Sequence, residues 1–299
     1  MEPWVVLAVA AAAFQTLRFA VQKRLTGAGL GAAGATFARF VWSAPLALGA
    51  ALGWAAATGQ AVPAPGGSFW LYAALGGLGQ ILATVCVLLL FKRRNFAVGL
   101  TFKKSEVILT ALLGLAVLGD ALTPMAVLAL LVGLAGLVLL ADPPEGGMGL
   151  RRLVNPSAGL GLLSGVFFAV AAVGYRGASL SLPSGDVALR ALWSLGLVTM
   201  LQTAMMLPWL ALREPGQIGA VLRGWRRTAP VGLLSMGGSG CWFAAFTLQS
   251  AALVFAVGQV EVLFGIALGW RVFRERLRGR ELAGIALLTV SILVVALAA

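Results

Sequence analysis

The sequence predicts an all-α integral membrane protein in which ten transmembrane helices form two inverted repeats of five helices each. Three observations indicate this fold class: 60% of the 299 residues are hydrophobic, only 11% are charged, and the apolar residues gather in repeated runs. A soluble domain needs about a quarter of its residues charged to cover its surface. The runs are about 20 residues long, which fits helices that cross a bilayer and not the ~10-residue strands of an outer-membrane barrel.

Ten apolar runs follow one another along the chain, and each is interpreted as one helix. The first run lacks a basic leader and a convincing cleavage site, so we expect it to remain in the protein as a helix. The expected spans are residues 4–22, 33–57, 69–91, 96–118, 122–141, 157–176, 187–211, 229–251, 254–272 and 279–298.

A polar connector divides the ten runs into five and five. It reads "DPPEGGMGLRRLVNPS" at residues 142–157. Its Pro, Gly and charged residues cannot lie in lipid-exposed backbone. The sequence therefore predicts a first five-helix repeat at residues 1–141, a connecting loop at 142–156 and a second five-helix repeat at 157–299.

Two sequence patterns recur in the same order in both halves, which indicates an internal duplication. "RFVWS" at Arg39 to Ser43 recurs as "RALWS" at Arg190 to Ser194, where each opens the second helix of its half. A second set also recurs at identical spacing: Glu106-Val107, Gly114, Asp120 and Leu122 are matched by Glu261-Val262, Gly269, Glu275 and Leu277. An odd number of helices per copy forces the second copy to insert upside down, so the repeat is expected to be inverted.

The basic residues predict how the chain crosses the membrane. Alternate connectors hold 16 of them: Lys23, Arg24, Lys92, Arg93, Arg94, Arg151, Arg152, Arg213, Arg223, Arg226, Arg227, Arg271, Arg274, Arg276, Arg278 and Arg280. The opposite side offers Arg176 and Arg190. By the positive-inside rule the crowded connectors are cytoplasmic, which predicts a bacterial-type inner membrane protein with both termini outside. Their position in short loops also argues against nucleic acid as a partner, despite the net charge of +12.

The last two helices of each half share a pattern in which one helix runs into a short turn of the form G-D/E-x-L. The pattern is carried by "GLAVLGDALTPMAVLALLVGLAGLVLLA" in the first half and by "GWRVFRERLRGRELAGIALLTVSILVV" in the second. It resembles the EamA-type drug/metabolite transporters, and the resemblance covers nearly the whole chain. The second turn departs from the family pattern, because it reads "FRERL" where the family usually has Gly before the acid. The resemblance implies a transporter of small organic solutes, with export as its direction.

Two carboxylates are expected near the middle of the bilayer. Glu106 and Glu261 lie about eight to ten residues into their predicted helices, at a rise of about 1.5 Å per residue. A lipid-facing carboxylate is costly there, so each should face a cavity or act as a structural hydrogen-bonding group. Lys103 lies three residues before Glu106 and can form an ion pair with it, whereas Lys104 is expected to extend toward the headgroups. Glu261 has no basic residue near it in sequence before Arg271, so it is the expected proton carrier.

Paired arginines and tryptophans add further candidates. Arg39 and Arg190 are expected either to flank a central cavity from its two ends or to anchor the helices at the headgroups. Trp42 and Trp193 would close that cavity or belong to the aromatic belt. Other candidates, each with the alternative of a simple helix–helix contact, are Gln80, Gln259, Tyr175, Trp242, Gln15, Arg18, Thr84 and Gln249.

These features predict a secondary-active transporter with alternating access and no enzymatic activity. The chain has no histidine and no Walker motif, and its two cysteines, Cys86 and Cys241, fall in apolar runs, so no catalytic residue, metal or cofactor is expected. The excess of positive charge among the candidates favours an amino-acid-like or anionic solute. Expected partners are a small-molecule solute, the lipid bilayer and protons, in a monomer or a homodimer. The alternative is an enzyme or lipid-handling protein acting at the headgroup level, which would need an acid, base or metal cluster that the sequence lacks.

Overall fold

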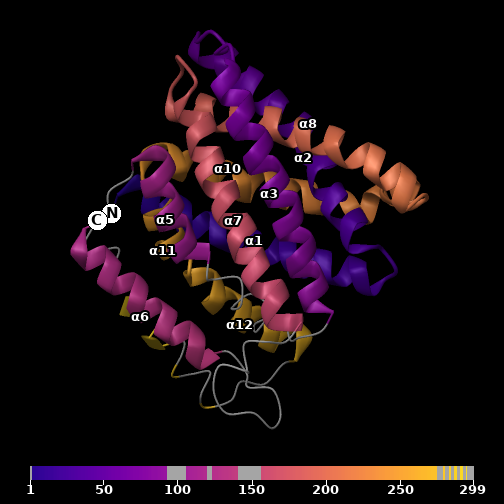
Figure 1. Ribbon diagram of the computed structural model, residues 1–299. Helices are drawn as coiled ribbons and strands as arrows, with labels where there is room; N and C mark the ends of the chain where they lie inside the picture. The colour runs from indigo at the N-terminus through magenta and orange to yellow at the C-terminus, as the bar shows by residue number, and fades with distance from the viewer. Residues whose placement is uncertain are drawn as a thin grey trace.

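In the computed structural model, every described element is a helix (Figure 1). The structure describes residues 2–92, 106–119, 123–140 and 156–274, together with the separate positions 279, 283, 286, 287, 290, 291 and 294. Lys103, Lys104 and Asp120 lie outside the described residues, as do nearly all of the predicted connecting loop and most of the predicted last helix. The ion pair expected between Lys103 and Glu106 therefore stays a prediction.

Seven helical segments within the described residues are long and apolar enough to cross a membrane, with α11 and α12 counted together as one segment. The chain is thus a multi-pass membrane protein. The helices are α1 (Pro3–Gly27), α2 (Ala32–Thr58), α3 (Gly67–Phe91), α5 (Glu106–Leu118), α6 (Pro124–Leu140), α7 (Pro156–Leu180), α8 (Val187–Arg213), α9 (Gln217–Arg223), α10 (Trp225–Leu248), α11 (Ala251–Val257) and α12 (Val260–Phe273).

The structure differs from the expected spans at residues 254–272, where one helix was predicted and two occur. α11 ends at Val257 and α12 begins at Val260, so the span is interrupted at Gly258 and Gln259. Glycine is a poor helix former, and the Trp242 ring lies against this position: a Cβ on Gly258 would come within 2.4 Å of Trp242 Cη2. The interruption brings Glu261 into the first turn of α12.

The most extensive helix contacts join the first half of the chain to the second. α3 packs on α7, α1 packs on α10, and α2 packs on α8 and α10 (Figure 1). α5 contacts α7 and α11, while α12 contacts α1. The largest hydrophobic cluster of the protein therefore joins the two halves.

Glycines allow α3 and α7 to approach closely. A Cβ on Gly174 would lie 2.7 Å from Gly76 Cα and 2.8 Å from Tyr72 O, both of which are backbone atoms. In lipid, where the hydrophobic effect does not drive helices together, such close van der Waals contact is a main source of helix association.

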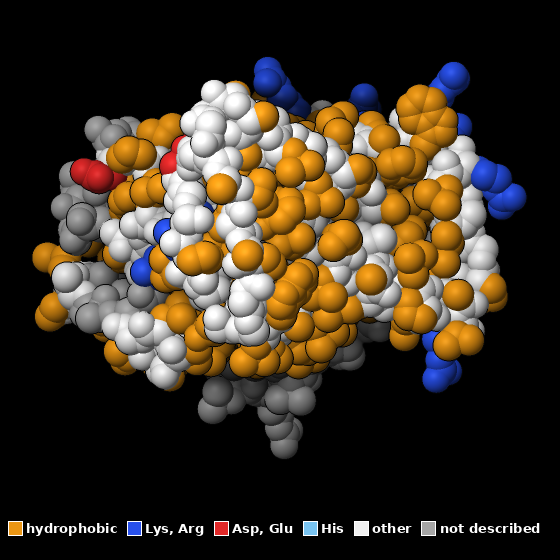
Figure 2. Space-filling model, turned by 90° about the horizontal axis from the view of Figure 1, so that it is seen from above, with side chains coloured by type: hydrophobic (Ala, Val, Ile, Leu, Met, Phe, Trp, Pro, Cys, Tyr) orange, Lys and Arg blue, Asp and Glu red, His pale blue; other side chains and the backbone are white. Residues whose placement is uncertain are grey.

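The face of the molecule that Figure 2 shows is largely apolar, and most of its basic side chains lie toward one end. Figure 2 shows hydrophobic side chains over much of the visible face, with Lys and Arg side chains projecting mainly at the right. The turns after α1 and α8 and the end of α3 share one surface groove, which is lined in part by Gly31, Lys92 and Gln217. Connectors that the sequence assigned to one side of the membrane thus lie together.

The close approach of α3 and α7 gives a stability prediction. Gly174→Ala should destabilise the folded protein by about 1–3 kcal/mol, because the added methyl group meets backbone that cannot rotate away. Gly159→Ala is the matched control in the same helix, since nothing lies within 4 Å of its Cβ position. Thermal unfolding of both variants in the same detergent provides the measurement, and equal melting temperatures would contradict the tight α3–α7 contact.

Candidate functional site

A small cavity lies between the two halves of the protein. Its volume is about 20 Å³, which is room for roughly one water molecule. Its walls come from α1, α3, α7, α10 and α11. The lining residues are Gln15, Gln80, Phe168, Ala171, Ala172, Tyr175, Ser239, Trp242, Phe243, Phe246 and Phe255.

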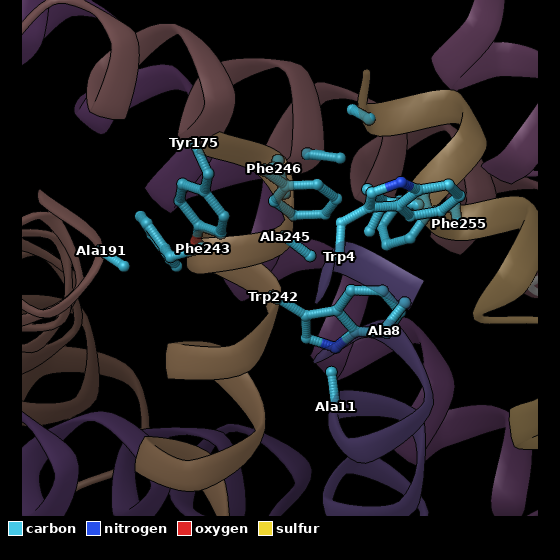
Figure 3. Close-up of a cluster of buried hydrophobic side chains, with 14 of the residues drawn as sticks. Trp4, Ala8, Ala11, Tyr175, Ala191, Trp242, Phe243, Ala245, Phe246 and Phe255 are labelled. Carbon is cyan, nitrogen blue, oxygen red and sulfur yellow. The ribbon is translucent and has the colours of Figure 1, made fainter. Parts of the chain in front are cut away.

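Aromatic rings form much of the cavity wall (Figure 3). The Trp242 and Phe246 rings are stacked with their centroids 5.7 Å apart, and Phe255 meets both rings edge-on at 5.2 and 5.4 Å. Tyr175 stacks on Phe243 with a centroid distance of 4.5 Å. Such ring pairs are stabilising beyond the apolar area that they bury, so this wall is a firm, flat surface.

A buried amide network connects α3, α7 and α8 at one side of the cavity. The Tyr175 hydroxyl donates to Gln80 Oε1 at 2.7 Å. Gln202 Nε2 donates to the same oxygen at 3.2 Å, to the Tyr175 hydroxyl at 3.1 Å and to Gly77 O at 3.0 Å. Gln80 and Tyr175 were predicted site residues, and the structure brings them together across the two halves.

Arg39 lies beside the cavity and is held by three hydroxyl groups. Its Nε donates to Ser235 Oγ at 2.8 Å, its Nη1 donates to Thr84 Oγ1 at 3.2 Å, and its Nη2 donates to Ser239 Oγ at 3.0 Å. The side chain is 1% exposed. None of these three partners carries a charge, so they satisfy hydrogen bonds of the guanidinium but leave its positive charge uncompensated.

A second buried guanidinium, that of Arg18, lies in α1 one turn after Gln15. Its Nη1 donates to Gln22 Oε1 at 2.6 Å, while its Nη2 has no hydrogen-bond partner among the described residues. Arg18 is also 1% exposed and interacts electrostatically with both Arg39 and Glu261. The insertion of an arginine at the centre of a membrane helix costs about 2.5–3.5 kcal/mol, and this chain buries one arginine in each of its first two helices.

Glu261 is joined to the cavity through Gln15. Gln15 Nε2 donates to Glu261 Oε1 at 3.2 Å, and Trp242 Nε1 donates to Gln15 Oε1 at 3.3 Å. In the sequence, the first basic residue that follows Glu261 is Arg271. In the fold, however, Arg18 interacts with Glu261 electrostatically from α1, 243 positions earlier in the chain.

The remaining carboxylate and amide candidates do not line the cavity. Glu106 is 1% exposed in the first turn of α5, a helix that packs on α7 and α11. Gln259 is also buried, but its amide lies against Gly133 of α6. The part that either plays in solute binding stays a prediction.

The RFVWS and RALWS motifs place their arginines differently. Arg190 donates from Nε and Nη2 to Ser179 O, at 2.9 and 2.7 Å, near the end of α7. Trp193 Nε1 donates to Pro63 O at 3.0 Å, and Trp42 Nε1 donates to Thr228 Oγ1 at 3.0 Å. All three are half-buried and none lines this cavity, so of these four motif residues Arg39 alone borders it.

Sequence reasoning missed three polar residues of this site. Ser235 and Ser239 are four residues apart in "SMGGSG" and therefore share one face of α10, a spacing that could have revealed them. Gln202 is a single amide in the apolar run "LVTMLQTAMM". An isolated amide within an apolar membrane helix normally bonds to a neighbouring helix, but the sequence does not tell which one.

Comparison with known proteins gives a family and a fold. Residues 156–297 match the EamA-like transporter family. Among solved structures, one crystal structure described only as that of a protein superposes with a TM-score of 0.68 at 16% identity, and the match covers 99% of this chain and 96% of the other. At that identity the likeness concerns the fold alone. The comparison with curated proteins finds no match.

The hydroxyl groups around Arg39 give a second stability prediction. Ser239→Ala should destabilise the protein by about 1–3 kcal/mol, because it removes an acceptor from a buried charged donor. Ser164→Ala is the matched control: Ser164 is equally buried, but its hydroxyl donates to Gly161 O within its own helix. Thermal unfolding in one detergent compares the two. If both variants unfold at the wild-type temperature, Ser239 does not hold Arg39.

Proposed function

We propose that this chain, of which residues 156–297 match the EamA-like transporter family, is a secondary-active exporter of a small organic metabolite, with amino-acid-like or anionic solutes favoured. One observation supports this function above the others. A small cavity with aromatic and neutral polar walls lies between the two halves of a membrane-embedded chain, and it is connected to Arg39 through Ser239 and to Glu261 through Gln15. Charged groups in membrane interiors mark solute and ion pathways.

The proposed architecture is ten helices in two inverted repeats, and the helix contacts support it. In such a repeat α1, α2, α3 and α5 of the first half correspond to α7, α8, α10 and α12 of the second. If the halves are exchanged, the α1–α10 contact becomes the α7–α3 contact. The exchange would likewise turn the α5–α7 contact into the α12–α1 contact, and the α2–α8 contact into itself. Each of these pairs occurs. The cavity lies between the halves, as expected for a transporter built from inverted repeats.

Alternating access requires that the cavity be closed at each end by contacts that can break. At the C-terminal end of α2, Asp186 accepts hydrogen bonds from Trp54 Nε1 and Gln60 Nε2. We call this contact the Asp186 latch. At the N-terminal end of α2, Gln217 Oε1 accepts from the Gly31 N–H at 2.9 Å, and we call this the Gln217 latch. Both latches join the first half of the chain to the second.

The Asp186 latch is stable at neutral pH. Hydrogen bonds from the backbone N–H of Leu189, and next from the Gln60 amide, lower the pKa of Asp186 below its ordinary value. A carboxyl group with a lowered pKa stabilises the fold above its unfolded-state pKa, and this contribution is lost as the pH falls through the folded-state pKa. The latch therefore weakens only in acid below the ordinary range of aspartate.

The basic residues support a position in a bacterial-type inner membrane with both termini outside. One groove, near the basic turns after α1 and α8, is lined by Gly31, Lys92 and Gln217. Arg176 lies near the C-terminal end of α7 and Arg190 near the N-terminal end of α8, which is the end of α8 away from this groove. The solute and the lipid bilayer are the proposed partners, and protons are the proposed coupling ion.

Reconstitution into vesicles tests transport and proton coupling together. Glu261→Gln keeps the side-chain shape and an oxygen that can accept from Gln15, but it cannot take up or release a proton. We expect the variant to lose the pH dependence of net transport while it still exchanges solute across the membrane. Glu106→Gln should instead weaken solute binding. The control is Glu2→Gln at the exposed start of α1. Proton-driven transport that persists in Glu261→Gln would reject the coupling role.

The two latches predict opposite shifts in access to the cavity. Gln60→Ala should open the Asp186 end and Gln217→Ala should open the other end, because each removes one contact between the halves. The reporter is Ala172→Cys, a cavity-lining position, in a chain with Cys86→Ala and Cys241→Ala, and it is labelled from either side of vesicles with an impermeant maleimide.

Thr203→Ala serves as the control for the latch experiment, since the Thr203 hydroxyl donates to Thr199 O in its own helix. Each latch variant should raise labelling severalfold from its own side. Labelling that rises from the same side in both variants would contradict alternating closure by these contacts.

A further inference from the structure

We infer that the solute is an organic monocarboxylate with an apolar, preferably aromatic, body, and that the guanidinium groups of Arg18 and Arg39 bind its carboxylate. The inference rests on the proposed transport function and names the chemical class that the same site selects. It distinguishes a simple organic anion from both a zwitterion and a cationic drug.

The charge balance around the cavity points to an anion. Arg18 and Arg39 are both 1% exposed and interact electrostatically with each other, and Glu261 is the acidic group that acts on Arg18. Among the described residues, the hydrogen-bond partners of Arg39 are hydroxyl groups, and the partner of Arg18 is an amide. Among the described residues, two buried positive charges beside one negative charge leave an excess that a single carboxylate would balance.

The guanidinium groups also retain donors for such a ligand. A guanidinium carries five N–H groups. Arg39 uses one on each of its three nitrogens, so one N–H on Nη1 and one on Nη2 remain. Arg18 Nη2 has no hydrogen-bond partner among the described residues, although it is fully buried. Arginine binds carboxylates through two such parallel N–H groups, which gives strong and directional recognition.

Arg39 reaches the cavity wall directly. Its Nη2 donates to Ser239, which lines the cavity, and Arg18 lies one turn beyond the cavity-lining Gln15 on α1. A carboxylate that enters beside Ser239 would meet the Arg39 guanidinium, and the charge of Arg18, which interacts electrostatically with Arg39, would attract it to the same place. The cavity of about 20 Å³ is too small for an organic solute, so binding requires the opening of one end.

The rest of the wall determines the body of the solute. Ring faces and edges are presented by Trp242, Phe246 and Phe255. The polar groups that line the cavity are all neutral: Gln15, Gln80, Tyr175 and Ser239. None of the described lining residues is acidic, so an ammonium group would find no carboxylate at the wall. Aromatic rings can bind a cation, but two neighbouring guanidinium groups repel it, and this repulsion provides selectivity.

The first test uses four probes with wild-type protein in nanodiscs: benzoate, benzamide, benzyltrimethylammonium and phenylalanine. Isothermal titration measures their affinities. Benzoate should bind at least tenfold more tightly than each of the other three. Equal or tighter binding of benzamide or phenylalanine would overturn the requirement for a simple anion, and tighter binding of benzyltrimethylammonium would reverse the assigned charge.

The second test uses variants. Arg39→Gln and Arg18→Gln should each weaken benzoate binding at least tenfold, and Arg39→Lys, which keeps the charge, should weaken it less than Arg39→Gln. The control is Arg176→Gln, because Arg176 follows the cavity-lining Tyr175 but donates to the Phe246 and Gln249 carbonyl oxygens. Unchanged benzoate affinity in a folded Arg39→Gln protein would overturn the assignment. If that variant does not fold, the relative affinities of the four probes for the wild-type protein still test whether the site selects a simple anion.

Transport and binding can fail separately. Uptake of labelled benzoate into vesicles that contain the protein, with arginine-dependent binding, supports both proposals. Arginine-dependent binding without movement across the membrane would leave the anion site standing and reject the transporter. Movement of the cationic probe, with no binding of benzoate, would support transport and overturn the anion site.

Discussion

A guanidinium group buried in a protein whose solvent is lipid has to find its hydrogen bonds inside that protein, and this requirement organises the interface between the two halves. Arg39 on α2 takes its partners from Thr84 on α3 and from Ser235 and Ser239 on α10. Because lipid offers no hydrogen bonds, α2 cannot leave α10 without exposing a charged donor. The cavity, the aromatic wall and the Gln80 network all lie around the same interface.

Apolar burial alone could not specify this arrangement. Lipid tails are as apolar as leucine, so helix partners are selected by close packing and by polar contacts. Gly174 lets α7 approach α3, and Gly232 lets α10 lie against Trp42 on α2. The hydrogen bonds of Arg39, Gln15 and Gln202 then fix which residues face one another, so geometry and polar chemistry both select the same partners.

The sequence predicted the membrane helices well, because α1, α2 and α3 follow from long apolar runs and begin and end within a few residues of the expected bounds. It could not predict the interruption at Gly258 and Gln259, because the Trp242 ring that lies against this position comes from another helix. For the same reason it treated Arg39 and Arg190 alike. Their motifs match, but one arginine meets hydroxyl groups of α10 and the other a carbonyl near the end of α7. Such partners become visible only in the fold.

The Arg39 contacts also affect the order in which the protein can fold during its synthesis, because Arg39 is made long before its partners on α10. Ser235 is synthesised 196 residues after Arg39, and at about 5–20 residues per second the second span waits about 10–40 s for it. During that interval the Arg39 guanidinium lacks the two serine hydroxyl groups of α10 that accept its hydrogen bonds in the folded protein. A chain truncated before α10 would therefore leave a membrane-embedded guanidinium with its acceptors on α3 alone, so the last helices of the protein are needed to stabilise one of its first.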